Sequence, residues 1–320
     1  MKTNVILHGD ALTQLKTLPN DSVDCCMTSP PYWALRNYNV EGQLGLEETP
    51  EEYINKLCSI FDEVKRVLKP EGTCWVNLGD TYSSQRWTGK GEGQPINKIK
   101  DGHRDINPER ITGLPEKCLV QIPSRFSLEM TNRGWILRNS LVWHKPVCMP
   151  SSAKDRFTID YEMIYFFTKN TDYYFKTQYE PLANSTIERL KHPWRSAKSS
   201  KLSKQVIGMT PESFDKAAIK LLADRRRIKR SVWKIRPSNY HGVHFATYPE
   251  KLCETPLDAG CPVGGIVLDP FFGAGTTGLV ALKQNKKFIG IELNNEYITM
   301  ANKRLKSYLY ENPFFGYDEN

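Results

Sequence analysis

A chain of 320 residues is long for a single hydrophobic core, so we expect one large α/β domain with a smaller inserted one. The eight cysteines contain no C-x-x-C pair, which argues against a zinc site or a disulfide framework, and no metal is expected. The sequence has no signal peptide and no uninterrupted apolar span, which excludes a membrane-spanning protein and predicts a cytoplasmic one. The net charge of +8 is concentrated in residues 185–236, where 15 Lys and Arg residues stand against four acidic ones.

The first predicted elements are a strand at residues 4–7, a short helix at 11–18 and a buried strand at 23–27. Asp10 follows the first strand in the run His8-Gly9-Asp10, where its carboxylate is placed to cap the helix. This alternation of strand and helix is typical of a parallel sheet with helices on both faces.

The segment after the second strand, residues 28–33 (TSPPYW), has residue types that suit a planar amine. Pro30 and Pro31 fix φ and lack N–H groups, so the turn presents the Pro30 carbonyl outward from the strand. Ser29 offers a hydroxyl acceptor beside it, so both hydrogens of one amine can be bonded. Tyr32 supplies a flat face, and stacking is worth about 1–3 kcal/mol per base in nucleic-acid contacts. An ordinary surface turn uses the same residue types, so the motif alone leaves both interpretations open.

The middle of the chain continues the alternation of helix and strand. Residues 49–52 (TPEE) form a capping box, and the helix after it carries a one-sided apolar stripe as far as Leu68. A strand is predicted at residues 73–78. Residues 83–110 are rich in Gly, Lys and Asn, and a loop that orders on a partner and an insertion without a role both fit them.

An amphipathic helix region is predicted at residues 115–133, followed by strands at 135–144 and 161–168 that form an antiparallel pair at the sheet edge. Trp143 lies near the end of the first of these strands, in the run Trp143-His144-Lys145-Pro146. A contact with substrate and a structural role are both consistent with its position.

The basic segment, residues 181–236, shows little helical or strand period and contains Trp194 and Trp233. Cations at this density neutralise phosphates and release counterions, and arginines among them can reach guanine edges. The candidate nucleic-acid contacts are Arg225, Arg226, Arg227, Lys229 and Arg230. A solvated charged insert without a partner is the alternative.

Residues 266–278 (IVLDPFFGAGTTG) read as an apolar strand, a glycine turn and the start of a helix, the arrangement of a cofactor loop. The glycines allow close approach of the backbone to a ligand, and Thr276 and Thr277 are placed to cap the helix. A further strand at 288–291 ends in Glu292, which is placed to accept hydrogen bonds from ribose hydroxyls.

Three glycines of this loop, Gly273, Gly275 and Gly278, also satisfy G-x-G-x-x-G. An NAD-dependent oxidoreductase is therefore a competing interpretation. The preceding Asp-Pro-Phe-Phe and the distant Ser-Pro-Pro-Tyr argue against it, because hydride transfer needs neither.

Together, the motifs at residues 29–32 and 271–275 resemble those of the β class of DNA amino-methyltransferases, the family of cytosine-N4 and adenine-N6 methylases. In this family the Pro-Pro-Tyr motif comes first, the recognition region follows and the Phe-x-Gly-x-Gly motif comes last, as here. Protein-glutamine methyltransferases have the opposite order of motifs. The sequence contains no Pro-Cys dipeptide, which disfavours methylation at carbon 5 of cytosine.

The resemblance implies a doubly wound, mostly parallel, Rossmann-like sheet in circularly permuted order, with S-adenosyl-L-methionine as cofactor. It assigns catalysis to Ser29, Pro30, Pro31 and Tyr32. It assigns cofactor binding to Asp10, Asp269, Phe271, Gly273, Gly275, Thr276, Thr277 and Glu292. Residues 241–250 would close over the methionine end of the cofactor, although His244 and Phe245 are equally interpretable as core residues.

The function implied by the resemblance is site-specific methyl transfer to the N4 amine of a cytosine flipped out of double-stranded DNA. In this family Ser before Pro-Pro-Tyr accompanies mostly cytosine N4, and Asp or Asn mostly adenine N6, so DNA adenine-N6 methylation is the alternative. A DNA-binding protein with a decayed transferase core is disfavoured by the intact motifs. The expected domains are a catalytic part at 1–180, a target-recognition insert at 181–236 and a cofactor-binding part at 237–320. A homodimer and a restriction endonuclease acting on the same site are expected as partners.

Overall fold

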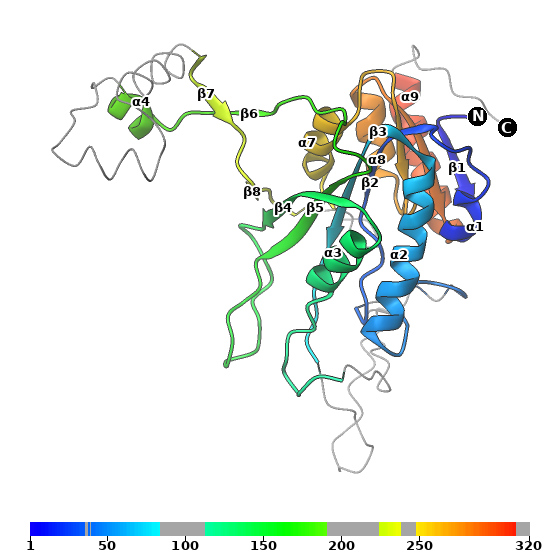
Figure 1. Cartoon of the computed structure of the whole chain (residues 1–320), viewed down its shortest axis with the longest axis horizontal. Coiled ribbons are helices and arrows are strands. Elements are labelled where there is room, and N and C mark those ends of the chain that lie inside the picture. Colours follow the sequence, from blue (N-terminus) through cyan, green and yellow to red (C-terminus); the bar gives the residue numbers. More distant parts are fainter. Residues whose placement is uncertain (36–37, 39, 84–112, 191–223, 238–247, 312–320) are drawn as a thin grey trace. The chain divides into compact units, whose positions relative to one another are not determined.

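The computed structural model in Figure 1 describes residues 1–35, 38, 40–83, 113–190, 224–237 and 248–311. The chain forms two compact units, one made of Met1–Lys176 with Ser231–Asn320 and the other of Thr177–Arg230. The second unit overlaps the insert expected at residues 181–236. The end of that expected insert belongs to the first unit, because Val232–Lys234 pairs with the large sheet.

The first unit is built on a sheet in which the described strands follow the order β1-β10-β9-β2-β3-β5-β4-β8. The strands are β1 (Val5–His8), β2 (Val23–Thr28), β3 (Leu68–Leu78), β4 (Ile136–His144), β5 (Tyr161–Thr168), β8 (Val232–Lys234), β9 (Ile266–Asp269) and β10 (Lys287–Glu292). From β1 to β3 all neighbours are parallel; β5 is antiparallel to both β3 and β4, and β8 is parallel to β4. This confirms the mostly parallel, doubly wound sheet.

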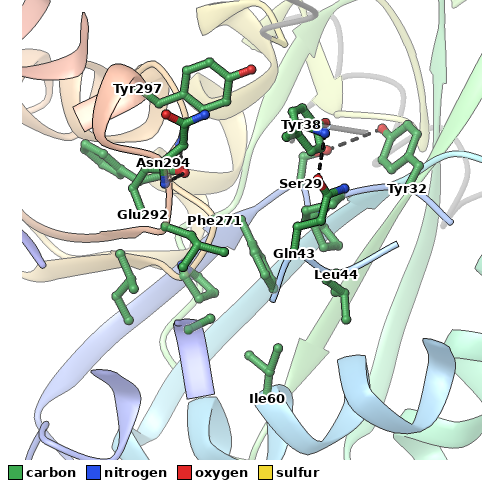
Figure 2. A pocket seen from close by; sticks show the side chains of 18 of the residues that line it. Ser29, Tyr32, Tyr38, Gln43, Leu44, Ile60, Phe271, Glu292, Asn294 and Tyr297 are labelled. Carbon is green, nitrogen blue, oxygen red and sulfur yellow. Dashed lines mark hydrogen bonds between the residues drawn. The ribbon is translucent and has the colours of Figure 1, made fainter. Parts of the chain in front are cut away.

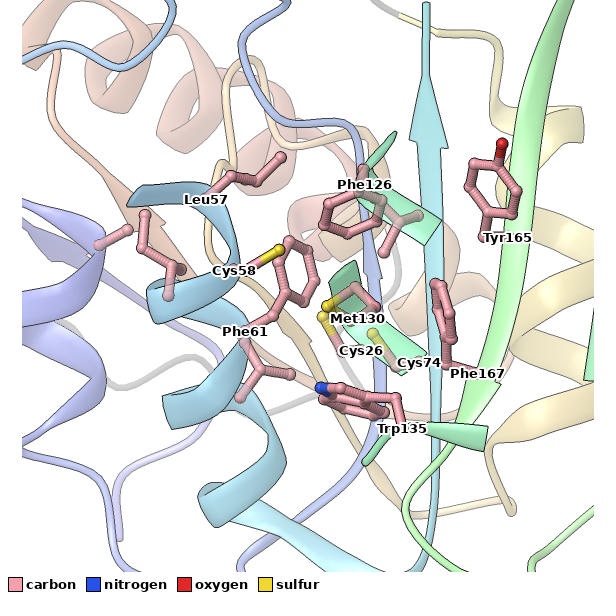
Figure 3. Close-up of a cluster of buried hydrophobic side chains, with 14 of the residues drawn as sticks. Cys26, Leu57, Cys58, Phe61, Cys74, Phe126, Met130, Trp135, Tyr165 and Phe167 are labelled. Atoms are coloured by element: carbon pink, nitrogen blue, oxygen red, sulfur yellow. The ribbon is translucent and has the colours of Figure 1, made fainter. Parts of the chain in front are cut away.

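Two sets of helices cover the two faces of the sheet. The helices α1 (Ala11–Leu15), α2 (Pro50–Val67) and α3 (Ile122–Asn132) share one buried cluster with the sheet. The helices α7 (Glu250–Gly260), α8 (Thr276–Lys283) and α9 (Asn295–Glu311) contribute to a second cluster on the other face. Figure 3 shows the first cluster, where Phe61 of α2 and Phe126 of α3 meet edge to face with ring centroids 5.3 Å apart.

The strand β2 has apolar side chains on both faces, as a central parallel strand requires. Val23 and Cys26 belong to the first cluster, whereas Cys25 and Met27 belong to the second. All eight cysteines are free thiols. Cys25 and Cys26, which lie on the strand just before the Ser-Pro-Pro-Tyr motif, are fully buried core residues.

Several element boundaries differ from the sequence-based expectation. Thr49 caps α2 as expected, since its hydroxyl accepts from the Glu52 N–H at 3.1 Å. The helix expected within 115–133 begins only at Ile122, directly after Gln121 in a left-handed conformation. The β4–β5 pair is antiparallel as expected, but it is not at the edge, because β8 pairs with the outer side of β4.

The second unit contains the antiparallel pair β6 (Tyr179–Pro181) and β7 (Arg226–Ile228), together with α4 (Asn184–Leu190). The basic segment therefore has regular structure that its sequence did not indicate. Within the described ranges, no helix combines the length and apolarity needed to cross a membrane.

Candidate active site

One cavity of 890 Å³ lies at the carboxyl ends of β2, β9 and β10. It is lined by Ser29–Tyr32 after β2, by Pro270–Ala274 after β9 and by Glu292 at the end of β10. Ligands of open α/β sheets bind at this edge, outside the carboxyl ends of the strands. Figure 2 shows Ser29 and Tyr32 on one side of the cavity and Glu292 on the other. The fold thus brings together two motifs that are far apart in the sequence.

The turn at Ser29–Tyr32 keeps two hydrogen-bond acceptors at the cavity wall. Tyr53 of α2 donates its hydroxyl to the Pro31 carbonyl at 2.8 Å and so anchors the turn to the core. Among the described residues, no hydrogen bond uses the Pro30 carbonyl. The Ser29 hydroxyl has only long contacts, 3.3 Å to Asn77 Oδ1 and 3.4 Å to the Tyr32 hydroxyl. Ser29 and Pro30 can therefore both accept from a group in the cavity.

Tyr32 is held at both its ring and its hydroxyl. A Cβ added at Gly79, just after β3, would come within 2.5 Å of Tyr32 Cε2, so only glycine leaves room for the ring. The Tyr32 hydroxyl donates to Glu162 Oε2 at 2.7 Å and lies 3.1 Å from Asn77 Oδ1. Burial, and then the negative charge of Glu162, raise the pKa of Tyr32 well above its usual value. Tyr32 is thus a neutral, fixed aromatic wall of the cavity.

Glu162, the second residue of β5, was not identified from the sequence as a site residue. Besides Tyr32, it accepts from Asn77 Nδ2 at 3.1 Å, and its other oxygen is ion-paired with Lys145. Asn77 also donates to the Met163 carbonyl at 3.1 Å, so its amide is fixed with Oδ1 toward Ser29. Polar residues inside two apolar strands, Asn77 in β3 and Glu162 in β5, were the only sequence signal for this network.

Trp143 and Lys145, near the end of β4, complete this side of the cavity. The Lys145 ammonium lies 4.6 Å from the centroid of the Trp143 ring. Trp143 is buried, and its Nε1–H donates to the Ile235 carbonyl at 2.9 Å. The sequence left a substrate contact and a structural role open for Trp143; the structure places it in the core and at the cavity wall.

The cofactor loop and Glu292 form the opposite side of the cavity. Glu292 Oε2 accepts from the Gly273 N–H at 2.7 Å, and Oε1 accepts from the Asn294 N–H at 2.8 Å. Burial raises the pKa of Glu292. A Cβ added at Gly273 would meet nothing within 4 Å, so the loop borders open space there. The cavity beside Glu292 and Phe271 therefore has room and acceptors for a polar ligand.

Asp269, the last residue of β9, lies behind the cavity wall and does not line it. It is fully buried, and its oxygens accept from Thr28 Oγ1 at 2.6 Å, Thr277 Oγ1 at 2.6 Å and the Tyr248 hydroxyl at 3.1 Å. It also accepts from the Phe271 N–H at 3.1 Å. Burial is the main cause of its raised pKa. Asp269 thus ties the end of β2 to the start of the cofactor loop.

The expectation that Thr276 and Thr277 cap α8 is wrong. Gly275 is the N-cap, in a left-handed conformation (φ 77°), and no side chain caps the helix. Thr277 instead donates to Asp269, while Thr276 Oγ1 accepts from Arg304 at 2.8 Å and lines the cavity. The two hydroxyls instead make tertiary contacts, with the buried Asp269 carboxylate and with Arg304.

Of the remaining residues predicted to bind the cofactor, some line the cavity and others pack behind its wall. Asp10 lines the cavity and also caps α1, because its Oδ1 accepts from the Thr13 N–H at 2.9 Å. Gly275 is not at the cavity; it packs beside Ala301 of α9. Gly278, the third glycine of the G-x-G-x-x-G match, packs against the buried ring of Phe272. Its role in the structure is packing inside the core.

The candidate nucleic-acid contacts lie in the second unit. Arg227 and Arg230 both pair with Glu180, at 2.8 and 2.7 Å. The Arg226 guanidinium lies 4.3 Å from the centroid of the Tyr179 ring. Part of the positive charge of the run 225–230 is therefore engaged inside the unit.

Some expectations fall outside the described residues. These are residues 241–247 of the segment expected to close over the cofactor, residues 84–110 of the loop expected at 83–110, and Trp194. In the part of the chain that the structure describes, His, Cys, Asp and Glu side chains form no cluster that could hold a metal ion.

A protein-family model described as DNA methylase, of the N6/N4 type, matches residues 23–303. The chain is 38% identical over 306 residues to the type II methyltransferase M.XycI of Xanthomonas campestris pv. cyanopsidis, covering 96% of this chain and 89% of that protein. It is 36% identical over 301 residues to the type II methyltransferase M.Cfr9I of Citrobacter freundii, covering 94% and 87%.

Two solved structures show the same fold. The PvuII DNA methyltransferase, described as cytosine-N4-specific, superposes with a TM-score of 0.61 at 21% identity, covering 95% of this chain and 86% of that one. A DNA modification methylase from Thermus thermophilus, complexed with S-adenosyl-L-methionine, gives a TM-score of 0.58 at 22% identity, covering 97% and 95%.

Proposed function

The chain belongs to the N6/N4 DNA methylase family, and on this premise we propose that it transfers a methyl group from S-adenosyl-L-methionine to the exocyclic N4 amine of cytosine in duplex DNA. One observation carries the proposal: Ser29 and Pro30, whose hydroxyl and carbonyl accept no hydrogen bond from the described residues, line the same cavity as the cofactor loop. One side of the cavity therefore suits an amine, and the opposite side suits a nucleoside-like ligand.

The cofactor half of the cavity has hydrogen-bond acceptors that suit S-adenosyl-L-methionine. When bound, this cofactor supplies a methyl group on a sulfonium centre. Glu292 still has acceptor capacity for ribose hydroxyls, and Phe271, Gly273 and Asp10 line the wall around it. Asp269, Gly275 and Thr277 support this wall from behind. The Thermus methylase of the same fold is described as complexed with this compound.

Ser29 and Pro30 would bind both hydrogens of the target amine. An exocyclic amine is a poor nucleophile because its lone pair is delocalised into the ring. Ser29 can donate its own hydrogen to Asn77 Oδ1, which leaves the hydroxyl lone pairs for the amine. Two acceptors on one nitrogen increase its electron density and orient it for in-line attack. No covalent intermediate is needed.

The target base cannot present its amine inside a duplex, so we propose that it is flipped into the cavity. Tyr32 would then replace the stacking lost from the duplex, and its network with Glu162 and Asn77 fixes the ring in place. The basic residues 225–230 are proposed to contact DNA phosphates from the second unit. Because the relatives are named type II methyltransferases, we propose a partner restriction endonuclease of the same specificity.

Cytosine N4 is proposed over adenine N6 because a serine precedes Pro-Pro-Tyr, and the PvuII enzyme of the same fold is described as cytosine-N4-specific. Adenine N6 is the alternative within the family, since the acceptor pair suits either amine. The oxidoreductase interpretation is not supported, because the DNA methylase model matches residues 23–303 and Gly278 serves packing.

The test is nucleoside mass spectrometry of unmethylated duplex DNA after incubation with the protein and S-adenosyl-L-methionine. N4-methylcytosine is the expected product. N6-methyladenine would retain the acceptor chemistry and overturn the choice of base. No methylated nucleoside, with cofactor binding shown by calorimetry, would contradict DNA as the substrate.

A further inference from the structure

The loop between β4 and β5, residues 145–160, carries the most exposed apolar side chains of the described chain. Phe157 is 95% exposed and Met149 is 89% exposed, and Val147 of the same loop is 62% exposed. Single exposed apolar residues are common on protein surfaces. A phenylalanine and a methionine almost wholly in water on one loop make this loop a candidate for contact with a partner.

This loop begins and ends at the active-site cavity. Lys145 at its start and Glu162 just after its end both line the cavity. The Lys145 N–H donates to the Asp160 carbonyl at 2.7 Å, which closes the base of the loop. Phe157 is five residues from Glu162, so its Cα lies within about 17 Å of that cavity residue even if the chain is fully extended. Figure 1 shows the loop extending beyond the ends of β4 and β5.

Contacts with the body of the first unit hold the loop in position. The Arg156 guanidinium lies 3.6 Å from the centroid of the Tyr82 ring. Asp155 pairs with Lys117 at 2.8 Å. Phe157 therefore follows directly after two anchored residues, while its own side chain stays in solvent. Such a side chain is presented outward at little further conformational cost.

We propose that Phe157, assisted by Met149, inserts into the base stack of duplex DNA beside the flipped nucleotide. The inference rests on the proposed function. It adds to the same site an apolar side chain, Phe157, that would contact the duplex and is called the wedge below. A base that enters the cavity leaves its neighbours without a stacking partner, and an apolar side chain next to the cavity can occupy that gap. The cation Lys154, on the same loop, suits a phosphate that flanks such a gap.

The experiment compares the wild-type protein with Phe157→Ala on two duplexes that contain the methylated site, once sequencing of methylated product has located it. In the first duplex the target base is paired. In the second it faces an abasic site, so flipping it breaks no base pair and costs less free energy. On the paired duplex we expect kcat/KM of Phe157→Ala to fall at least about tenfold. On the abasic duplex we expect it to stay within about twofold of wild type, because the wedge is no longer needed.

The matched control is Val263→Ala, which truncates another exposed apolar residue (78%) just before β9, at the opposite end of that strand from the cavity. The Val263→Ala variant should have the same kcat/KM as wild type on both duplexes. Phe157→Leu, which keeps an apolar wedge, should recover most of the rate on the paired duplex. Thermal melting would verify that each variant is folded.

Two results would contradict the assignment of Phe157 as the wedge while leaving the proposed function intact. One is a Phe157→Ala variant as fast as wild type on paired DNA. The other is an equal loss on both duplexes, which would assign Phe157 a contact unrelated to base opening. A wild-type protein that methylates neither duplex would contradict the proposed function itself.

Discussion

The hydroxyl of Tyr32 lies 2.7 Å from a carboxylate oxygen of Glu162, a residue 130 positions later in the chain. Glu162 also binds the Asn77 amide and the Lys145 ammonium, and Asn77 in turn reaches Ser29. The two predicted catalytic side chains, Ser29 and Tyr32, are thus oriented by residues from three other strands or strand ends.

Tyr32→Ala should abolish most methyl transfer while leaving cofactor affinity nearly unchanged. The reason is that Tyr32 lies on the side of the cavity proposed to hold the amine, across from Glu292. Loss of one stacked aromatic costs about 1–3 kcal/mol, or roughly five- to 150-fold in rate. Single-turnover kinetics and calorimetry with S-adenosyl-L-methionine separate the two effects. An equal loss of cofactor affinity would contradict the assignment of Tyr32 to the base.

Glu162→Gln should slow methyl transfer by about tenfold or more without weakening cofactor binding. The amide keeps the shape of the side chain but removes the charge that Tyr32 and Lys145 use, and a hydrogen bond to a charged group is worth about 1.5–3 kcal/mol. Asp160→Asn, two residues away and exposed at the base of the loop, is the matched control and should retain activity. If the two variants behave alike, Glu162 does not position Tyr32.

Glu292→Gln should weaken binding of S-adenosyl-L-methionine and leave the folded state intact. The carboxylate binds the Gly273 and Asn294 N–H groups and is proposed to accept from ribose hydroxyls. Since burial raises the pKa of Glu292, protonation as the pH falls should weaken cofactor binding at a higher pH than for an ordinary glutamate. Calorimetry across this pH range tests both statements. A dissociation constant that is the same for both proteins at every pH would exclude Glu292 from the cofactor site.

Asp269→Ala should lower the free energy of unfolding by about 2–4 kcal/mol, because the hydroxyls of Thr28, Thr277 and Tyr248 lose their shared acceptor. Urea denaturation measures this loss. Asp269→Asn should cost less, because the amide oxygen still accepts.

The pH dependence of Asp269→Asn follows from the raised pKa of the wild-type carboxyl. A carboxyl whose folded-state pKa lies above its ordinary value of 3.8 contributes stability at low pH and loses it as the pH rises through the folded pKa. The stability of wild type relative to Asp269→Asn should therefore decline as the pH rises above about 4. The opposite slope would show that hydrogen bonding outweighs burial at this residue.

Replacing Arg225, Arg226 and Arg227 by alanine should flatten the salt dependence of DNA binding. Each lost phosphate contact reduces the slope of log K against log salt by about 0.9. Glu180→Gln is an informative companion, because it releases Arg227 and Arg230 from their ion pairs and should tighten DNA binding. Fluorescence anisotropy over a salt series measures both variants. An unchanged slope in the triple variant would move the DNA contacts elsewhere.

The sequence by itself determined the features that depend on local pattern and order. Apolar runs predicted β2 and β9, the capping box predicted α2, and the order of the two motifs indicated the family that the comparisons show. These inferences succeed because strand and helix periods and cap chemistry act over only a few residues.

Only the tertiary structure decided which side chains meet. Glu162 reaches Tyr32 because β5 lies antiparallel to β3 in a register that pairs Leu78 with Met163. Asp269 accepts from the Thr28 hydroxyl, 241 residues away in the chain, because the end of β9 lies beside the end of β2. Such contacts depend on the register of strands that are distant in sequence, and that register is set by how both faces of the sheet pack.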